Sequence, residues 1–200
     1  FLLMQDADLV PPELISEQDS FSVVLRYKSV FSEADQRWLD GFQPLRLTKE
    51  ERLVALLGKD GSTLSPQQIY DRLRLVDWDV YRVIIEQVQT KGIIYNSLSE
   101  LEKKNIAKRA KISQRQVPRI VVRQPQECEK GLADLFSALY QSRPVDFVTS
   151  QYLNKVLQAL PPGNIYRTNS ARLCRLLGSI GFIDEARRPT SLMKIVWGKQ

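Results

Sequence analysis

The chain has 200 residues, enough for one or two domains, and its formal net charge is +6. Hydrophobic residues make up 43% and charged residues 26%, and the longest apolar runs are far too short to span a membrane. There is no histidine, and Cys128 and Cys174 are the only cysteines. These counts exclude Ser-His and Cys-His catalysis and leave a zinc site almost nothing to build on.

The charge divides the chain into three segments. Residues 1–46 hold four basic and eight acidic residues. Residues 47–124 hold fifteen basic and nine acidic residues, and residues 125–200 hold ten basic and six acidic residues. We predict that residues 1–46 are a linker and strand segment from an upstream domain. Residues 47–124 and 125–200, named here the first and second modules, are predicted to be separate domains. Their basic character fits contact with nucleic acid.

The first segment is expected to be a linker followed by one strand and one short helix. Residues 1–20 are predicted to be extended, with the apolar run Phe1–Met4 as the end of a strand whose partners lie upstream. Phe21–Tyr27 is rich in β-branched and aromatic residues and predicts a strand. Ser32 is expected to cap a helix over 33–42. We interpret the chain as part of a larger protein.

The first module begins with three predicted helices, over 48–58, 65–73 and 77–91, each opened by a capping residue. A fourth helix is expected over Ser97–Ala110, capped by Ser97, in the place where a short wing would otherwise lie. Arg119–Arg123 then predicts a strand.

The second module is predicted to contain three helices and a hairpin. The helices begin at Glu127, after Thr149 and after Asn169. Ile183 is expected to enter a hairpin whose return strand is Leu192–Trp197.

One pattern occurs in both modules: an amphipathic helix that ends at a lone glycine followed by an apolar strand. The two copies are Tyr81–Ile94 and Ser170–Ile183, aligned on Gly92 and Gly181. The positions eight and four before each glycine are apolar, namely Ile84 and Val88 in one copy and Leu173 and Leu177 in the other. A third helix followed by a glycine and a strand is typical of a winged helix-turn-helix. We predict a mainly α fold with short β-hairpins (α+β), built as tandem winged-helix-like modules.

The densest basic stretch is Lys103–Arg123, which has no acidic residue among its 21. Its eight cations are Lys103, Lys104, Lys108, Arg109, Lys111, Arg115, Arg119 and Arg123. Contact with phosphates would neutralise them and release counterions. We expect them to bind nucleic acid; a solvated face or an acidic protein partner is the alternative.

The two predicted third helices differ in charge. The first carries Asp77, Asp79 and Glu86, which would be repelled by phosphates, and the second carries no acid. We therefore expect the second helix and its hairpin tip to contact DNA, through Arg167, Asn169, Arg172, Arg175, Arg187 and Arg188. The alternative is that these arginines are ordinary surface residues. The acidic helix of the first module is better suited to a protein partner or a second copy.

No glycine-rich phosphate loop, no paired acids at metal spacing and no activated nucleophile occurs in the sequence. We expect these residues to contain no catalytic residue, no metal and no cofactor. A cytoplasmic location is expected, with association with the prokaryotic nucleoid as one option.

The run Leu9–Tyr27 (LVPPELISEQDSFSVVLRY), followed by a helical winged-helix unit, resembles the C-terminal region of Schlafen-like (AlbA-type) transcriptional regulators and RecG-related ATP-dependent helicase-like proteins. The resemblance covers roughly residues 9–95. It implies that nucleotide-binding and AlbA-like portions lie outside these residues, and that an upstream domain could be ATPase-like. We expect the chain to be the DNA-binding C-terminal region of a larger transcriptional regulator or DNA-processing protein. The alternative is a protein-interaction or dimerisation module of winged-helix fold.

Overall fold

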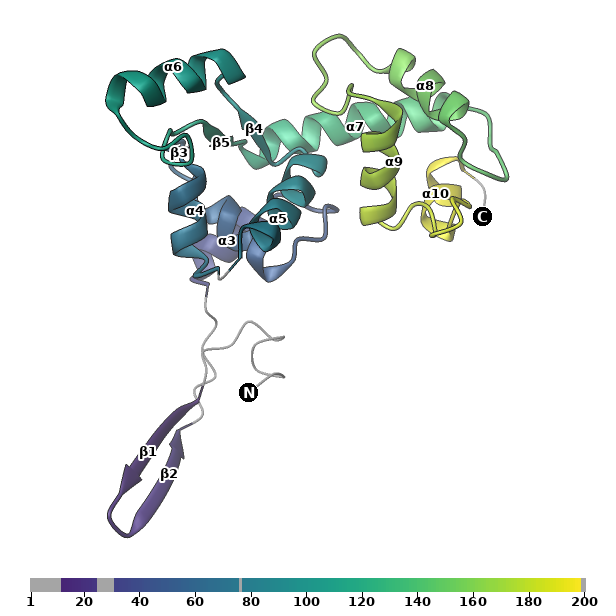
Figure 1. Ribbon diagram of the computed structural model, residues 1–200. Helices are drawn as coiled ribbons and strands as arrows, with labels where there is room; N and C mark the ends of the chain where they lie inside the picture. Colours follow the sequence, from purple (N-terminus) through teal and green to yellow (C-terminus); the bar gives the residue numbers. More distant parts are fainter. Residues whose placement is uncertain (1–11, 25–30, 76, 199–200) are drawn as a thin grey trace. The chain divides into compact units, whose positions relative to one another are not determined.

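The computed structural model describes residues 12–24, 31–75 and 77–198, and Figure 1 shows their helices and strands. Contacts divide the chain into two compact units, 1–40 and 41–200. The described residues form α-helices and two small antiparallel sheets, so the predicted α+β class with mainly helical content is confirmed. Both modules fall in the second unit, and the predicted boundary between them at residue 125 stays a prediction.

The first unit contains a hairpin and a short helix. Strand β1 (Glu13–Glu17) pairs with β2 (Ser20–Val24) across a two-residue turn. The predicted linker over 1–20 is therefore wrong for residues 13–17, where the neighbouring prolines concealed a strand. Of the strand predicted over Phe21–Tyr27, residues 25–27 lie outside the described residues. The predicted strand end Phe1–Met4 also lies outside them. Helix α2 (Glu33–Asp40) follows Ser32, whose Oγ accepts the Asp35 N–H at 3.1 Å, which confirms the predicted cap.

The first module follows the predicted order of helices closely. Its first four elements are α3 (Lys49–Leu57), β3 (Thr63–Leu64), α4 (Pro66–Arg72) and α5 (Trp78–Thr90). Thr48 and Ser65 form capping boxes, and the Asp77 side chain caps α5, so all three helix starts are confirmed. A capping box satisfies two orphan backbone N–H groups at once, which is why the sequence signal was reliable.

A three-stranded antiparallel sheet completes this module. Strands β4 (Ile94–Asn96) and β5 (Ile120–Val122) flank helix α6 (Glu100–Ala110), and the sheet order is β3-β5-β4. The predicted start of α6 at Ser97 is wrong. Ser99 forms the capping box with Glu102, while the Ser97 N–H and Oγ–H both donate to the Arg119 carbonyl and so prolong the β4–β5 pairing.

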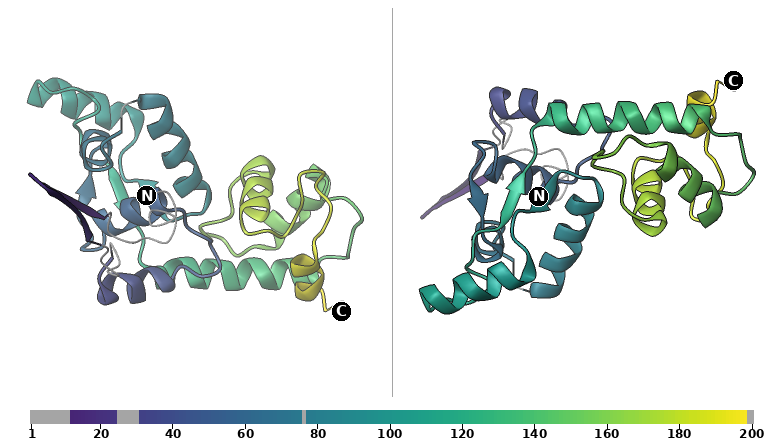
Figure 2. Two further views of the ribbon diagram at one scale, coloured as in Figure 1. Left: turned by 90° about the horizontal axis from the view of Figure 1, so that it is seen from below. Right: turned by 90° about the horizontal axis from the view of Figure 1, so that it is seen from above.

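Four helices build the second module. They are α7 (Pro125–Gln141), α8 (Ser150–Ala159), α9 (Ser170–Ser179) and α10 (Ser191–Val196). The side chains of Thr149 and Asn169 cap α8 and α9, as predicted. Helix α7 runs from the end of β5 into the second module, as both views of Figure 2 show, and α8 and α10 contact it there.

The predicted return strand Leu192–Trp197 is wrong, because this segment forms helix α10. The expected hairpin is reduced to one β-bridge between Ile183 and Pro189, with backbone bonds from the Thr190 N–H to the Phe182 carbonyl and from the Asp184 N–H to the Arg188 carbonyl. Proline has no N–H to extend a ladder, so pairing stops and the chain turns into a helix. A six-residue apolar run alone does not separate strand from helix.

The helix and glycine of the repeated pattern are confirmed in both copies, but the strand that was expected to follow is present only after Gly92. Gly92 and Gly181 have φ values of +75° and +79°, in the left-handed region. In both copies the residue after the glycine donates to the carbonyl five residues before it, and the glycine donates to the carbonyl three before it. These two bonds define a Schellman motif, which satisfies carbonyls at the helix end. The four apolar positions that the alignment matched are all buried.

Gly92 offers the first testable prediction. Gly92→Ala adds a Cβ that would lie 2.9 Å from Tyr166 Cε1 and forces alanine into a left-handed conformation. We expect it to lower the free energy of unfolding by about 2–4 kcal/mol, measured by urea denaturation.

Gly61→Ala is the matched control, because Gly61 also has positive φ (+80°) but nothing lies within 4 Å of its added Cβ. It should cost only about 1 kcal/mol. Equal losses for the two variants would contradict a steric role of the Tyr166 ring.

Candidate nucleic-acid interface and the pocket between the modules

A buried ion pair holds the end of α5 against the start of α3. Lys91 Nζ lies 2.6 Å from Glu51 Oε2 and also donates to the Arg46 carbonyl at 2.7 Å. The two charged side chains are only 7% and 1% exposed. The same Glu51 oxygen accepts the Thr48 N–H at 2.7 Å, so the carboxylate joins the α3 cap to the α5 terminus. Buried charges need such additional hydrogen bonds to offset their desolvation.

Tyr166 joins the second module to this point. Its side chain is buried, and its O–H donates to the Lys91 carbonyl at 3.2 Å. The ring packs between two glycines, because an added Cβ at Gly92 or Gly131 would lie 2.9 Å or 3.0 Å from it. The Cys128 Sγ–H donates to the Gly92 carbonyl, with 3.8 Å between the sulfur and the oxygen. Burial raises the pKa of the Tyr166 hydroxyl and raises that of the Cys128 thiol to about 12.

Three of the eight cations in the predicted basic stretch serve the fold. Lys103 is buried and pairs with Glu100. Arg123 donates through Nη1 to the Gly92 carbonyl at 2.9 Å, and its guanidinium lies 4.4 Å from the centre of the Tyr95 ring. Arg119 donates to the Gln114 carbonyl within the loop before β5. These contacts support the sheet and the loop.

The other five cations are exposed. They lie on α6 and in the loop that follows it: Lys104, Lys108, Arg109, Lys111 and Arg115. Lys108, Arg109 and Lys111 form no ion pair with any residue in the described part of the chain. Lys111 ends α6 with φ +54°. These three charges therefore stand uncompensated at the end of one helix.

Arg115 fixes the loop after α6 against α5. Its guanidinium lies 4.0 Å from the centre of the Trp78 ring, which itself stacks on Tyr70 at 4.3 Å. The Arg115 carbonyl also accepts the Gln67 N–H at 2.9 Å. A cation over an aromatic face is attracted by the ring quadrupole, so this stack anchors the loop to α4 and α5.

The arginines predicted on the second module are only partly brought together. Arg175 pairs with Glu86 of α5, so the basic α9 and the acidic α5 face each other. Arg172 points into a pocket, and the Asn169 side chain is used as the α9 cap. Arg188 pairs with Asp184 beside the single β-bridge, while Arg167 and Arg187 are exposed. The predicted DNA-reading face of α9 is thus directed toward the first module.

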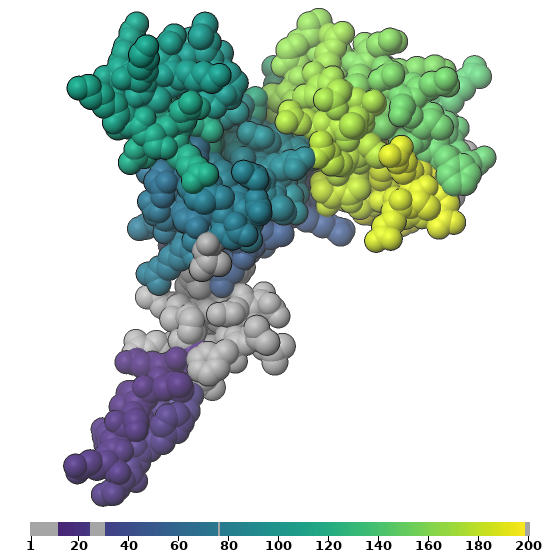
Figure 3. All heavy atoms as spheres, viewed as in Figure 1, coloured from purple at the N-terminus to yellow at the C-terminus, as the bar shows by residue number. Residues whose placement is uncertain are grey.

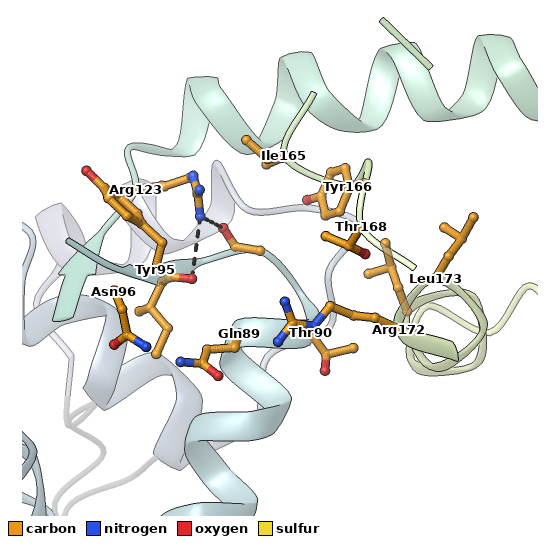
Figure 4. A pocket seen from close by; sticks show the side chains of 13 residues that line it. Gln89, Thr90, Tyr95, Asn96, Arg123, Ile165, Tyr166, Thr168, Arg172 and Leu173 are labelled. Atoms are coloured by element: carbon orange, nitrogen blue, oxygen red, sulfur yellow. Dashed lines mark hydrogen bonds between the residues drawn. The ribbon is translucent and has the colours of Figure 1, made fainter. Parts of the chain in front are cut away.

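The pocket lies where the two modules meet. Its volume is about 250 Å³, and its walls come from the end of α5, β4, the α8–α9 loop and α9. Figure 4 shows Arg123 and Tyr166 on one side and Gln89, Thr90 and Arg172 on the other. In Figure 3 the surface is hollowed between the α6 segment and α9. None of the described residues that line this pocket carries a carboxylate.

Sequence reasoning missed this junction. Tyr166 is 75 residues from its hydrogen-bond acceptor at Lys91, and no local pattern connects them. The isolated Gly131 within α7 was the only available signal, since a glycine inside a helix costs stability and often marks a close approach.

Comparisons with known proteins return no significant match. No protein family model, no curated protein and no solved structure matches the chain. Among the described residues, no helix is long and apolar enough to cross a membrane, and no three metal-ligating side chains lie together.

The two thiols give a prediction about the junction. Because the pKa of Cys128 is raised to about 12, its thiol stays protonated at pH 8, whereas the partly exposed Cys174 is accessible. We expect Ellman's reagent to modify one thiol per native chain at pH 8 and two after denaturation. Cys174→Ser should abolish the native reaction; rapid labelling of that variant would contradict the burial of Cys128.

The contact between α5 and α9 can be measured with a double-mutant cycle. Glu86 and Arg175 are about half exposed, so we expect Glu86→Ala and Arg175→Ala to show a coupling of about 0.2–1 kcal/mol in unfolding free energy. Glu86→Ala combined with Arg187→Ala, at an exposed arginine, should be additive. Coupling in the control pair but not in the test pair would contradict the contact.

Proposed function

We propose that this chain binds nucleic acid, in the first place duplex DNA, through the end of α6 and the loop that follows it. The single observation that carries the proposal is the group of exposed cations Lys108, Arg109 and Lys111, which form no ion pair with a described residue. Such a group repels itself unless an anion neutralises it, and contact with phosphates gains free energy through counterion release.

The order of elements supports a winged-helix assignment for the first module. The order is helix α3, strand β3, helices α4 and α5, and strands β4 and β5, with α6 inserted between the last two strands. In the sheet, β5 lies between β3 and β4. In this scheme α6 is an enlarged wing that carries the cations. The second module would be a related unit with α7, α8 and α9 as its three helices and a wing reduced to one bridge.

The contacts of α5 and α9 favour binding without strong sequence preference. Glu86 on α5 and Arg175 on α9 satisfy each other, and Arg172 lines the pocket, so α9 does not present these two arginines to base edges. Cations on a wing contact phosphates, which position a protein on DNA but carry no sequence information.

We extend the proposal to the whole protein through the resemblance of Leu9–Tyr27 to Schlafen-like regulators. The chain would then be the DNA-binding C-terminal region of a larger cytoplasmic regulator or DNA-processing protein. The test below does not depend on that extension.

A protein-interaction role is the second candidate, and one observation favours it. Leu101 is 70% exposed on α6, and Ile106 and Ile112 are also exposed on this segment. Exposed apolar side chains among cations can form a mixed protein interface. Salt distinguishes the two roles, because phosphate binding weakens steeply with salt and apolar association does not.

Replacing Lys108, Arg109 and Lys111 together with Ala tests the proposal. We expect binding to a fluorescent duplex to weaken for all sequences alike, and the slope of log affinity against log salt to fall by about 2–3. Fluorescence anisotropy across a salt series measures both effects.

The matched control replaces three exposed lysines of the second module, Lys130, Lys155 and Lys194, and so removes the same charge elsewhere. It should keep most of the affinity and slope. Equal losses in the two variants, or no binding by the unchanged chain at low salt, would contradict the proposal.

A further inference from the structure

The pocket between the modules combines two guanidinium groups with several neutral polar side chains. Arg123 and Arg172 line it together with Gln89, Thr90, Asn96 and Thr168. Figure 4 shows that the Arg172 side chain extends from α9 toward Gln89 and Thr90 at the end of α5. The donors that meet here come from both modules.

Arg172 brings a positive charge to this pocket that no described residue pairs, whereas Arg123 is partly balanced by Glu127. Arg172 forms no ion pair with any of the residues that the structure describes, and none of the residues in the pocket wall is acidic. Glu86 pairs with Arg175, and Glu127 lies 3.8 Å from Nε of Arg123, a residue of the pocket wall. An anion that enters the pocket would therefore meet the unpaired Arg172 and, beside it, an Arg123 whose charge is only partly balanced.

The two arginines have different roles in this arrangement. Arg123 is fixed, because Nη1 donates to the carbonyls of Gly92 and Ile94 and its guanidinium rests on the Tyr95 ring. It adds a fixed charge at the wall. The Arg172 side chain forms no hydrogen bond or ion pair with a residue that the structure describes, so its planar fork is available to a ligand with paired oxygens.

The size of the pocket limits the ligand. Its volume of about 250 Å³ lies below the range of about 300–1,000 Å³ typical of sites for drug-sized ligands. A phosphate group suits the charge, since the free guanidinium of Arg172 can pair with two phosphate oxygens and the fixed Arg123 adds further positive charge at the wall. The neutral donors and acceptors of Gln89 and Asn96 suit a small polar group attached to it.

We propose that this pocket binds the phosphate monoester of a nucleotide, with Arg172 as the residue that contacts its oxygens. The monoester could belong to a free nucleoside monophosphate or to the 5′ end of a nucleic-acid strand. This inference is independent of phosphate contacts on α6, because the pocket shares no residue with the group Lys108, Arg109 and Lys111.

Calorimetry with the full 200-residue chain tests the proposal, with adenosine monophosphate and adenosine as probes at low salt. We expect the monophosphate to bind and adenosine not to bind. A short single strand with a 5′ phosphate should be compared with the same strand ending in 5′ hydroxyl. Tighter binding of the phosphorylated strand assigns the site to strand ends, and equal binding of the two strands with retained monophosphate binding assigns it to free nucleotides.

Variants connect the binding to the pocket. Arg172→Gln should weaken monophosphate binding about tenfold or more, because it removes a charged hydrogen-bond donor. Arg172→Lys should have an intermediate effect, since it keeps the charge but loses the fork. Arg167→Gln, at an exposed arginine five residues away, is the matched control and should leave the affinity unchanged.

Three results would overturn the proposal: no binding of the monophosphate at millimolar concentration, equal binding of adenosine, or unchanged affinity in Arg172→Gln. A circular-dichroism melt checks that each variant is folded. The triple alanine variant of Lys108, Arg109 and Lys111 separates the two proposals, because it should lose duplex binding and keep monophosphate binding.

Discussion

The buried ion pair between Lys91 and Glu51 is the constraint on which the arrangement of the second unit depends. It ties the C-cap residue of α5 to the first turn of α3, and both charges are satisfied by backbone groups as well as by each other. A charge pair of this kind tolerates only one geometry, since displacement of either partner leaves a desolvated charge. The peptide that leaves Lys91 is then fixed, and its carbonyl becomes the acceptor for Tyr166. The hydrogen bond between Tyr166 and the Lys91 carbonyl, which joins the two modules, therefore depends on the ion pair within the first module.

The same constraint explains how the charges of this chain are divided. Near the junction, cations are used internally: Lys91 on Glu51, Arg123 on backbone carbonyls, Arg175 on Glu86. Farther away, on the end of α6, they face solvent without partners in the described residues. The net charge of the sequence counts the cations that are paired within the fold together with the exposed cations of α6. What a nucleic acid could meet is the second group and the unpaired Arg172 in the pocket.

The sequence predicted local structure well and long-range contacts poorly, for physical reasons. Thr48, Ser65, Asp77, Thr149 and Asn169 were correctly identified as caps, because a cap depends on residues within one turn. Gly92 and Gly181 were correctly matched, because a helix end in the left-handed conformation is also a local property. The strand at 13–17 and the helix at 191–196 were missed, since short apolar segments take the structure that their partners permit. In the candidate site, the exposed cations of α6 belong to the basic stretch Lys103–Arg123 that the sequence indicated. The pairing of Arg175 and the pocket were not foreseeable, because the residues that meet there are distant in sequence.

The ring of Tyr166, packed between Gly92 and Gly131, has a consequence for how such a chain can change during evolution. Each of the three positions restricts the other two: a side chain at either glycine needs a smaller residue at 166, and a smaller residue at 166 leaves the Lys91 carbonyl without its donor. Because one glycine belongs to the first module and the other two residues belong to the second, exchange of one module for a relative would break the set. The two modules are thus expected to be inherited together, and substitutions at these three positions are expected to occur jointly.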